Sequence, residues 1–597
     1  MTADSVLAEY ESRLRETERF WAKRNTESTV ARTALLVSAM VFLLVGMEAA
    51  RRRVPVWWPA VPVAAAALAG RAYSRSRAAQ TRTWRLKRFL DQAVQRAKGA
   101  WVGCGFAGEE FDTGSHLYAS DLGVFGEGSL FEFLDITRTA IGRRGLANYL
   151  LQPPGLAETL ARQDAVRELE GRADLRQRIA VLGEYGFSEA RWGTFAAWLD
   201  APPVRFSRGV RVAMACTSAM LLAVLAGAAA EGGYGSALWI PFTEAGAVLM
   251  ALHGAVGLIY RSRVRRVLEH SWPLSGETAT VRDGLEILGS EHFHSSKLAG
   301  LAELARSATK PIGKLQRLLR ALDERNKDWI YPASLPLLAG TQLAMAVAQW
   351  RVAHGEDLRS WLEAWGEFEA LNALGSYAHE SPDSTYPEFV ESGPRFEAAA
   401  LGHPLLPNRS CVRNDVRLGP ETGFCVVSGS NMSGKSTLLR AIGSNAVLAS
   451  AGAPVRARSL RLSRMTLCTS LSVVDSLLNH KSKFLAEVER LRQMITAAPG
   501  GIPVLFLIDE IFSGTNSRDR RVAAEAVVRT LIAGGAIGAV STHDMSLTEI
   551  ADKLGGENVH MGSRNGSDPM DFDYLLKPGP TTESNALAIA RMAGVPL

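Results

Sequence analysis

The chain has 597 residues, of which 47% are hydrophobic and 21% charged, and its formal net charge is +6. This length suggests about three to five domains, and the composition excludes an intrinsically disordered chain. The charged share lies below the ~25% that is usual in soluble domains, so the chain is more apolar than a purely cytosolic enzyme. Its five cysteines include no C-x-x-C pair, so we expect no disulfide framework or zinc site, and a reducing compartment fits.

The N-terminal region is polar at first and then apolar. Residues 1–32 predict an amphipathic helix and lack the features of a signal peptide. Residues 33–70 contain two apolar stretches, Thr33–Ala50 and Val54–Gly70, joined by three arginines. Each approaches the ~20 residues that a membrane helix needs. We therefore expect residues 33–70 to form a first transmembrane hairpin.

A second pair of apolar stretches occurs within residues 206–262. Val212–Ala230 contains no charge, and the stretch from about Ser236 to Tyr260 contains Glu244 and His253. The short connector between them has no Lys or Arg, which predicts a second transmembrane hairpin. Glu244 and His253 mark a polar pathway, or they satisfy each other or a neighbouring helix.

Arginines flank both hairpins and indicate their orientation. Under the positive-inside rule, such clusters stay in the cytoplasm. We expect a multi-pass protein of the inner (cytoplasmic) membrane, in contact with the lipid bilayer, with its helical regions and its C-terminal domain in the cytoplasm. The alternative is that the four stretches are buried core helices of a large soluble protein. The flanking basic residues are Lys23, Arg24, Arg32, Arg71, Arg75, Arg77, Arg82, Arg85, Lys87, Arg88, Arg205, Arg208, Arg211, Arg261, Arg263, Arg265 and Arg266.

The rest of the chain divides by its pattern of predicted helices and strands. Residues 71–114 predict a basic helical linker, and residues 115–205 and 263–395 predict helical domains. From residue 396 to 597, short β-rich runs at 424–428, 504–508 and 537–541 alternate with helical segments, which is typical of an α/β domain with a largely parallel sheet. The predicted fold class is mixed: an all-α region carrying two membrane hairpins precedes a C-terminal α/β domain.

A phosphate-binding loop opens the α/β domain. Residues 429–436 match G-x-x-x-x-G-K-[ST], between an apolar run and a helical run, which is the context that this motif requires. We expect backbone N–H groups and the helix N-terminus to hold the phosphates of ATP, Lys435 to reach the β/γ-phosphates and Ser436 to ligate Mg²⁺. The predicted nucleotide-binding residues are Gly429, Ser430, Asn431, Met432, Ser433, Gly434, Lys435, Ser436 and Thr437.

Two further apolar runs end in polar residues. Residues 504–508 lead into Asp509 and Glu510, which is the Walker B arrangement. We expect Asp509 to hold Mg²⁺ and Glu510 to orient and deprotonate the attacking water. The run at 537–541 leads into Thr542 and His543, and His543 is expected to contact the γ-phosphate.

These elements resemble the MutS family of ABC-type ATPases. The phosphate loop carries Asn431-Met432, Walker B continues from Asp509-Glu510 to Gly514-Thr515, and Thr542-His543 is similar to the family's T-H element. The end of the chain, Ser584-Asn585-Ala586 to Gly594-Val-Pro596, is similar to the family's closing segment, although Asn585 and Ala586 depart from it. The helical regions around residues 133–146 and 263–395 resemble the family's core and lever helices.

The resemblance also implies roles that the residues alone do not. Ser482, in Ser482-Lys-Phe-Leu-Ala-Glu487, is similar to a family serine that faces the γ-phosphate of the opposite subunit, which implies a homodimer. Tyr574 lies where the family places a ring beside the adenine. The chain has no room for the family's mismatch-reading domain, and the membrane hairpins are additional. It looks like a membrane-anchored MutS-like ATPase that lacks the mismatch-recognition domain.

Three functions follow as alternatives. The first is a dimeric ATPase that couples ATP binding and hydrolysis to DNA, either in a mismatch-repair-related role or on branched DNA. The second is an ABC-type motor coupled to its membrane helices or to a protein partner, without DNA. The third is a scaffold that binds ATP without hydrolysing it. Duplex binding relies on many Lys and Arg contacts, whereas most arginines here flank the predicted spans, so the sequence leaves DNA binding open. No small-molecule substrate besides ATP is implied.

Overall fold

The chain divides by its internal contacts into two compact units. Unit 1 contains residues 1–136, 146–181 and 370–597, and unit 2 contains residues 137–145 and 182–369. The computed structural model describes residues 2–55, 57–183, 197–198, 200–230, 239–271, 275–325, 327, 331–334, 337–430, 432–471, 483–497, 501–512, 517–564 and 571–581.

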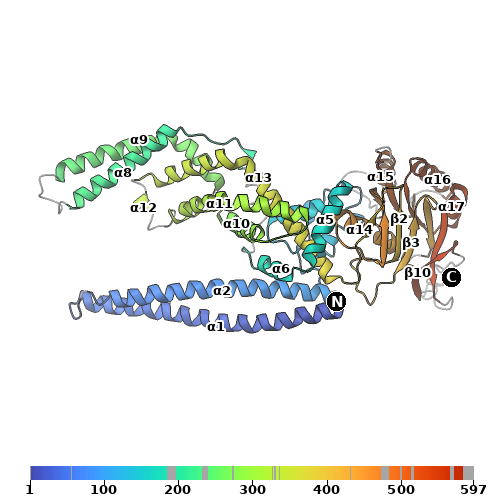
Figure 1. Cartoon of the computed structure of the whole chain (residues 1–597), viewed down its shortest axis with the longest axis horizontal. Coiled ribbons are helices and arrows are strands. Elements are labelled where there is room, and N and C mark those ends of the chain that lie inside the picture. The colour runs from blue at the N-terminus through green and yellow to red at the C-terminus, as the bar shows by residue number, and fades with distance from the viewer. Residues whose placement is uncertain are drawn as a thin grey trace. The chain divides into compact units, whose positions relative to one another are not determined.

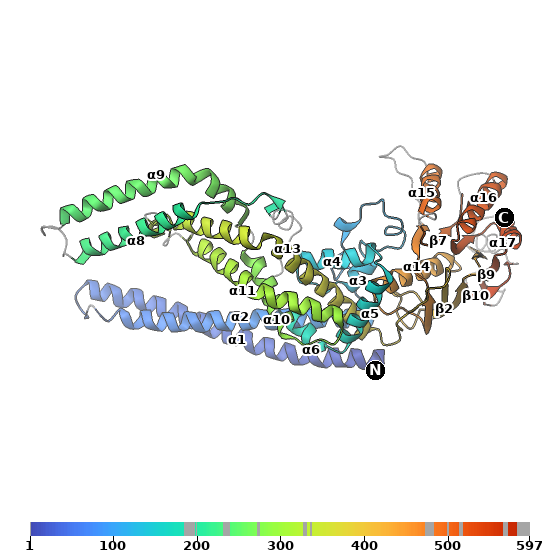
Figure 2. The same ribbon diagram turned by 45° about the horizontal axis from the view of Figure 1, so that its top comes forward.

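Unit 1 begins with a long antiparallel pair of helices, α1 (Ala3–Ala50) and α2 (Ala60–Lys98), which run side by side (Figures 1 and 2). Cross-helix contacts fix their register: the Gln80 side chain donates to Asn25 over 2.7 Å, and Lys87 pairs with Glu18 over 3.0 Å. Helix α1 continues without a break from the predicted amphipathic segment into the first apolar stretch. Helix α2 likewise joins the second apolar stretch to the basic segment.

The base of this pair is held by a small apolar core and a buried ion pair. The core residues are Val6, Tyr10, Phe89, Leu90, Ala93, Val94 and Ala180. Beside them, Arg96 donates to both oxygens of Glu380 over 2.7 and 2.8 Å, and Ser376 donates to the same carboxylate over 3.0 Å. Burial alone raises the pKa of Glu380, but Arg96 outweighs it and holds the pKa below its ordinary value. The α1–α2 pair is therefore anchored to the segment that enters the α/β domain.

Short elements of unit 1 connect this pair to the α/β domain. They are η1 (Glu109–Phe111), α3 (Leu130–Leu134), α5 (Leu156–Glu170) and α6 (Ala173–Ala180), with the last residues of α4 (Ala140–Leu151). The buried carboxylate of Asp121 accepts from the Thr469 hydroxyl over 2.7 Å and from the Leu471 amide over 3.2 Å. This carboxylate fixes the N-terminal segment to the end of an α/β-domain strand.

Unit 2 is helical in its described residues. It contains α8 (Arg208–Ala230), α9 (Trp239–Ser271), α10 (Ser275–Ser290), α11 (Ser296–Arg325), α12 (Tyr331–Ser334) and most of α13 (Ala339–Glu380), whose last residues belong to unit 1. The fully buried Trp365 of α13 lies against Gly284 of α10. A side chain at position 284 would occupy the space of the indole, so this glycine permits the close approach of the two helices.

The α8–α9 pair has a polar interior and an apolar exterior. The buried Ser218 hydroxyl and the buried His253 ring lie 3.0 Å apart, and Gln342 donates to Ser218 over 2.7 Å. Glu244 is exposed, and the hydrogen-bond partner of His253 is Ser218 of α8 rather than Glu244. The large exposed apolar side chains on these two helices are Val212, Met220, Leu222, Val248, Met250, Leu252, Leu258 and Ile259.

By length and composition, two helical segments within the described ranges qualify as candidate membrane spans: Ala3–Ala50 and Glu244–Leu268. The first coincides with α1 and the second lies within α9. This test uses only length and apolar content, which core helices of soluble proteins also satisfy.

The α/β domain of unit 1 contains two sheets. A six-stranded sheet has the order β10-β9-β4-β8-β7-β6, in which only β10 runs antiparallel to its neighbour. Its strands are β4 (Phe424–Gly429), β6 (Thr466–Ser470), β7 (Val504–Asp509), β8 (Ile537–Thr542), β9 (Glu557–Ser563) and β10 (Phe572–Pro578). The three strands that the sequence predicts are thereby confirmed. A four-stranded sheet, β1 (Glu388–Phe389), β5 (Ser459–Leu462), β2 (Phe396–Leu401) and β3 (Asn414–Leu418), lies ahead of it in sequence except for β5.

Helices cover the six-stranded sheet on both faces. Alternate residues of β7, such as Phe506 and Ile508, enter a core with α15 (Lys483–Ala497), α16 (Ser517–Ala533) and α17 (Thr548–Leu554). Side chains in between, such as Leu507, face α14 (Lys435–Ala451) on the other side. Because successive strand residues point to opposite faces, a strand buried on both sides reads as the continuous apolar run seen in the sequence.

The Arg96–Glu380 ion pair should dominate the stability of the α1–α2 attachment. Arg96→Met leaves the buried Glu380 carboxylate without its cation, which typically costs about 3–5 kcal/mol. We expect native-state hydrogen exchange of the α2 amides around Phe89 to lose protection by that amount. Lys98→Met is the matched control, because Lys98 pairs with Glu11 at the surface and such pairs contribute about 0–1 kcal/mol. Equal losses in both variants would contradict this assignment.

Candidate functional site

The candidate site lies where three neighbouring parallel strands end. In the sheet, β4 pairs with β8 and β8 pairs with β7, with Ser428 opposite Thr542 and Asp509 opposite Ser541. The carboxyl ends of these strands therefore meet at one edge, where α/β proteins bind ligands. The phosphate loop follows β4, Glu510 follows β7 and His543 follows β8.

The phosphate loop depends on residues with left-handed backbone. Gly429 has φ of 151° and Gly434 has φ of 101°, and a Cβ at Gly429 would collide with the carbonyl of Met561. Met432 has φ of 72° although it carries a side chain. Such a conformation is uncommon outside glycine and turns the chain sharply enough to begin α14 at Lys435.

Lys435 is poised at the mouth of this loop. Its ammonium donates to the carbonyls of Gly429 over 2.9 Å and Ser430 over 2.8 Å. Burial lowers the pKa of Lys435, and the nearby carboxylates of Asp509 and Glu510 oppose that shift. A lysine ammonium has three donors, so this arrangement fixes its position with two and leaves one for a phosphate oxygen.

The acidic pair after β7 is held from β8. The Ser541 hydroxyl donates to the Asp509 carboxylate, and the Glu510 amide donates to the Ser541 carbonyl over 3.1 Å. The Nδ1 atom of His543 lies 3.0 Å from a carboxylate oxygen of Glu510. The sheet register thus brings together the two side chains predicted to act on water and the γ-phosphate.

Backbone strain concentrates at this site. Among the described residues, seven non-glycine residues have positive φ, and Met432, Glu510, Phe512 and Tyr574 are four of them. Each such conformation costs on the order of 1–3 kcal/mol and persists only where the surroundings enforce it. The clustering supports a functional role for these turns.

Two charged side chains clamp the turn after Glu510. Glu487 of α15 accepts from the Phe512 amide, and Arg520 of α16 donates to the Phe512 carbonyl over 3.1 Å. Arg520 also lies 3.6 Å from the Asp544 carboxylate, next to His543. Arg520 therefore links the turn after β7 to the turn after β8. No motif in the sequence signals this contact, since its partners are distant in the chain.

Tyr574 lies over the phosphate loop. Its ring would be 3.0 Å from a Cβ at Gly434, and 43% of the residue is exposed. Asn414 fixes its backbone, because the Asn414 side chain donates to the Tyr574 carbonyl over 3.0 Å and accepts from the Leu576 amide over 2.7 Å. The predicted contact of Tyr574 with a base stays a prediction, but its place beside the loop is consistent with it.

The sequence-predicted residues that the structure describes therefore gather at one place. Asn431 and Ser482 lie outside the described residues, as do Gly514 and Thr515. Ser436 and Thr437 begin α14, where Thr437 is exposed. Ser436 and Asp509 offer hard oxygen ligands, and Mg²⁺ in nucleotide sites is usually bound by few protein groups together with phosphate oxygens and water. The residues present fit that group.

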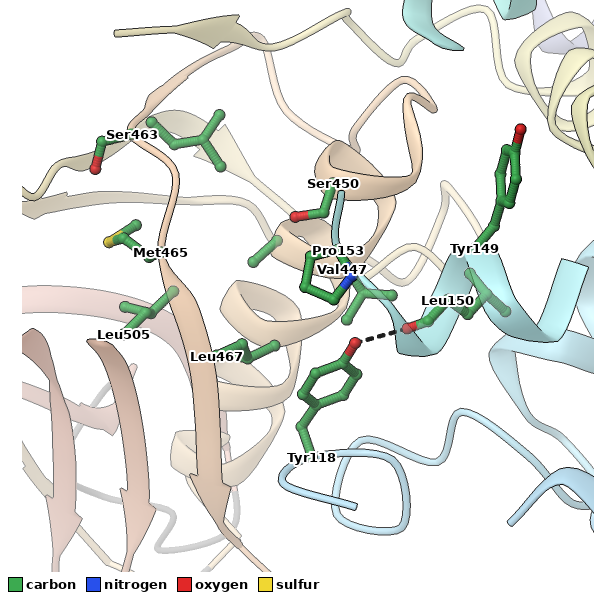
Figure 3. A pocket seen from close by; sticks show the side chains of 12 residues that line it. Tyr118, Tyr149, Leu150, Pro153, Val447, Ser450, Ser463, Met465, Leu467 and Leu505 are labelled. Atoms are coloured by element: carbon green, nitrogen blue, oxygen red, sulfur yellow. Dashed lines mark hydrogen bonds between the residues drawn. The ribbon is translucent and has the colours of Figure 1, made fainter. Parts of the chain in front are cut away.

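A separate small cavity lies away from this site (Figure 3). It has a volume of about 20 Å³, which is room for about one water molecule. The Tyr118 hydroxyl donates to the Leu150 carbonyl at its edge over 2.7 Å. Its lining comes from α4, α14, β5, β6 and β7. The cavity is too small for a nucleotide.

Comparison with known proteins agrees with this geometry. The family model of MutS domain V matches residues 425–597, which contain the candidate site. The domain at residues 425–597 is therefore a MutS-family domain. The chain is 32% identical over 233 residues to DNA mismatch repair protein MutS 2 of Halobacterium salinarum, which covers 38% of this chain and 27% of the relative.

Two more MutS-family relatives show how far the similarity extends. DNA mismatch repair protein MutS of Myxococcus xanthus is 26% identical over 519 residues, which covers 79% of this chain and 56% of the relative. DNA mismatch repair protein MSH6 of Arabidopsis thaliana is 30% identical over 270 residues, covering 41% and 20%. The matches thus span about a fifth to a half of these relatives' own lengths.

Gly434 offers a sharp test of the loop geometry. Gly434→Ala adds a Cβ against the Tyr574 ring at a φ that alanine rarely adopts, so we expect nucleotide binding to be lost. Gly535→Ala is the control, because Gly535 has a φ of 77° but open space around it. It should cost about 1 kcal/mol of stability and leave binding of a fluorescent ATP analogue unchanged. Normal binding by Gly434→Ala would refute the proposed loop.

Proposed function

We propose that this chain is a membrane-associated ATPase of the MutS family that binds and hydrolyses ATP at an interface between two copies and couples the cycle to DNA. The observation that carries hydrolysis is the Glu510–His543 pair, 3.0 Å apart, beside a phosphate loop on the neighbouring strand. A general base must lie within hydrogen-bond reach of the attacking water. Glu510 meets this condition if the water lies beside the γ-phosphate, because it follows β7 at the sheet edge that carries the phosphate loop.

Each residue of the site has a distinct role in this proposal. Backbone N–H groups of the loop and the N-terminus of α14 bind the phosphates, and Lys435 neutralises charge on the β/γ-phosphates. Ser436 and Asp509 hold Mg²⁺, which supplies further charge neutralisation in the transition state. Glu510 accepts a proton from the water, and His543 orients Glu510 and contacts the γ-phosphate. Tyr574 stacks on the base.

The proposal of a dimer rests on Ser482. The resemblance to the MutS family implies that this serine faces the γ-phosphate of the opposite copy. Exposed apolar side chains lie close by in sequence, on the first turns of α15: Phe484 at 42%, Leu485 at 45% and Val488 at 37% exposure. An apolar strip of this kind supports burial against a second copy.

Glu510→Gln should separate binding from hydrolysis. The amide keeps the shape and the contact with His543 but cannot accept the proton, so we expect turnover to fall by about 10²–10⁴-fold while ATP affinity is retained. Lys435→Ala should instead weaken ATP binding itself. Glu525→Gln is the control, since Glu525 lies on the surface of α16 and pairs with Arg529. Wild-type turnover in Glu510→Gln would remove Glu510 from the mechanism.

Membrane association is supported by the inverted polarity of the α8–α9 pair. Ser218 and His253 are buried between helices, whereas large apolar side chains such as Leu258 and Ile259 are 71% and 70% exposed. In water, exposing large apolar side chains and burying polar ones is unfavourable. In a lipid bilayer the same arrangement is favourable. Helix α1 shows the same exposure along its apolar half. With its arginine flanks, this arrangement supports a multi-pass protein of the cytoplasmic membrane.

The membrane proposal predicts how the full chain fractionates. We expect the wild-type chain to stay in the membrane pellet after alkaline carbonate washing and to need detergent for extraction. The double variant Val248→Arg, Leu252→Arg, in the middle of the predicted span, should lose much of this retention, because an arginine in the bilayer core costs about 2.5–3.5 kcal/mol. Val522→Arg, on the exposed face of α16, should change nothing. A wild-type chain that is soluble and monodisperse without detergent would overturn the proposal.

Coupling to DNA is supported by the relatives, whose names place them in DNA mismatch repair. Steady-state ATP turnover with linear, mismatched and branched DNA tests it. Stimulation that fades with salt would support coupling, and the preferred DNA form would identify the task. Turnover that ignores every DNA would direct attention to the membrane helices or a protein partner.

A further inference from the structure

The outer face of helix α2 has an unusual charge distribution. From Ala60 to Leu90 the helix contains no aspartate or glutamate, whereas residues 71–88 contain seven Arg and Lys. Two of the seven are used within unit 1: Lys87 pairs with Glu18 over 3.0 Å, and Arg85 donates to the Val181 carbonyl over 2.9 Å. The other five are exposed, and they define the arginine face: Arg71, Arg75, Arg77, Arg82 and Arg88.

Three of the five arginines of this face point away from α1, and Arg77 and Arg88 lie on its flank. Gln80 and Lys87 contact α1 directly, which fixes the inner side of α2. At about 100° per residue, Arg71, Arg75 and Arg82 project from the opposite side. Within the described part of the chain none of these three has a carboxylate partner.

Aromatic rings hold the flank of this face. Arg77 lies 6.0 Å from the Tyr73 ring centre and donates to its hydroxyl over 3.2 Å, and Arg88 lies 5.8 Å from the ring of Trp84. These contacts restrict two long side chains. Because these side chains are already restricted, binding a partner costs less side-chain conformational entropy.

Lipid headgroups account for only part of the arginine face. The predicted span ends at Gly70, and the interfacial layer is roughly 5–8 Å thick on each side of the bilayer core. At about 1.5 Å per residue, Arg71 and Arg75 lie within that layer. Arg82 and Arg88 lie roughly 18 and 27 Å beyond Gly70, further than the layer plus a Debye length of about 8 Å at physiological salt. A helix tilt of about 20° changes this little.

We propose that the arginine face of α2 binds the phosphate backbone of duplex DNA, independently of sequence. The face is about 26 Å long, which matches roughly eight base pairs of duplex at 3.4 Å each. A duplex reaches every arginine of the face, whereas the bilayer and its screened field reach only Arg71, Arg75 and Arg77. This inference rests on the proposed function for its partner, and it places that partner on the α1–α2 pair rather than on the α/β domain.

The test uses the full chain in nanodiscs of zwitterionic lipid and a fluorescent DNA duplex. Binding is measured by anisotropy between about 50 and 200 mM salt. The distal variant replaces Arg77, Arg82 and Arg88 by Gln. Loss of three phosphate contacts should lower the slope of log affinity against log salt by about 2.7 and weaken binding about 10- to 100-fold at 100 mM salt.

The matched control replaces three exposed arginines of α1, Arg15, Arg19 and Arg24, by Gln. It removes the same charge from the same helix pair, on a helix rich in glutamate, and should leave the salt slope unchanged. Equal losses in both variants overturn the proposal, because net charge alone would then explain binding. The proposal also fails if the distal variant loses affinity for anionic vesicles but not for DNA, or if the wild type binds no DNA.

Basal ATP turnover separates this inference from the proposed function. All variants should hydrolyse ATP at the wild-type rate without DNA. A chain that hydrolyses ATP but binds DNA equally well without the distal arginines refutes only the arginine face. A chain that binds DNA through this face but does not hydrolyse ATP refutes only the ATPase assignment.

Discussion

The candidate site depends on one constraint, the parallel pairing of β4, β8 and β7. Parallel neighbours end at the same edge of the sheet. The pairing of Ser428 with Thr542 and of Ser541 with Asp509 therefore brings the phosphate loop, the acidic pair and His543 together through the backbone alone. A shift of one residue in β7 would turn Asp509 to the other face of the sheet. The apolar residues that alternate along β7 fill both cores, and they are what prevents that shift.

Local patterns predicted the parts of this site that are encoded locally. The loop from Gly429 to Ser436 combines a strand, glycines and a helix start, and its chemistry follows from adjacent residues. The clamp on Phe512 was not predictable, because its members come from different helices: Glu487 ends a segment that resembles a family motif but indicates no contact with Phe512, and Arg520 matches no pattern. Asn414 escaped for the same reason, since its partners on β10 are about 160 residues away. Tertiary contacts of this kind leave no periodic pattern in the sequence, so they cannot be predicted from it.

Helix boundaries show the complementary limit. The sequence suggested a division near Thr33, where polarity changes, but α1 runs from Ala3 to Ala50 without interruption. Polarity reports the solvent around a helix, whereas a helix ends only where backbone geometry changes, at proline, glycine or a cap. No proline or glycine occurs between Ala3 and Val45. One helix therefore extends from the part of unit 1 outside the predicted membrane through the whole apolar stretch.

Arginine serves two opposite purposes on α2, and burial distinguishes them. Arg96 is buried, and a buried guanidinium needs a carboxylate in bidentate contact, which Glu380 provides; its role is to hold the helix pair together. Arg71, Arg75 and Arg82 are exposed and have no acidic residue near them on their own helix. Exposed charges of one sign contribute nothing to folding and repel one another. For Arg71 and Arg75 the headgroup layer of the predicted membrane offsets this repulsion, whereas for Arg82, which lies beyond that layer, a bound polyanion would offset it.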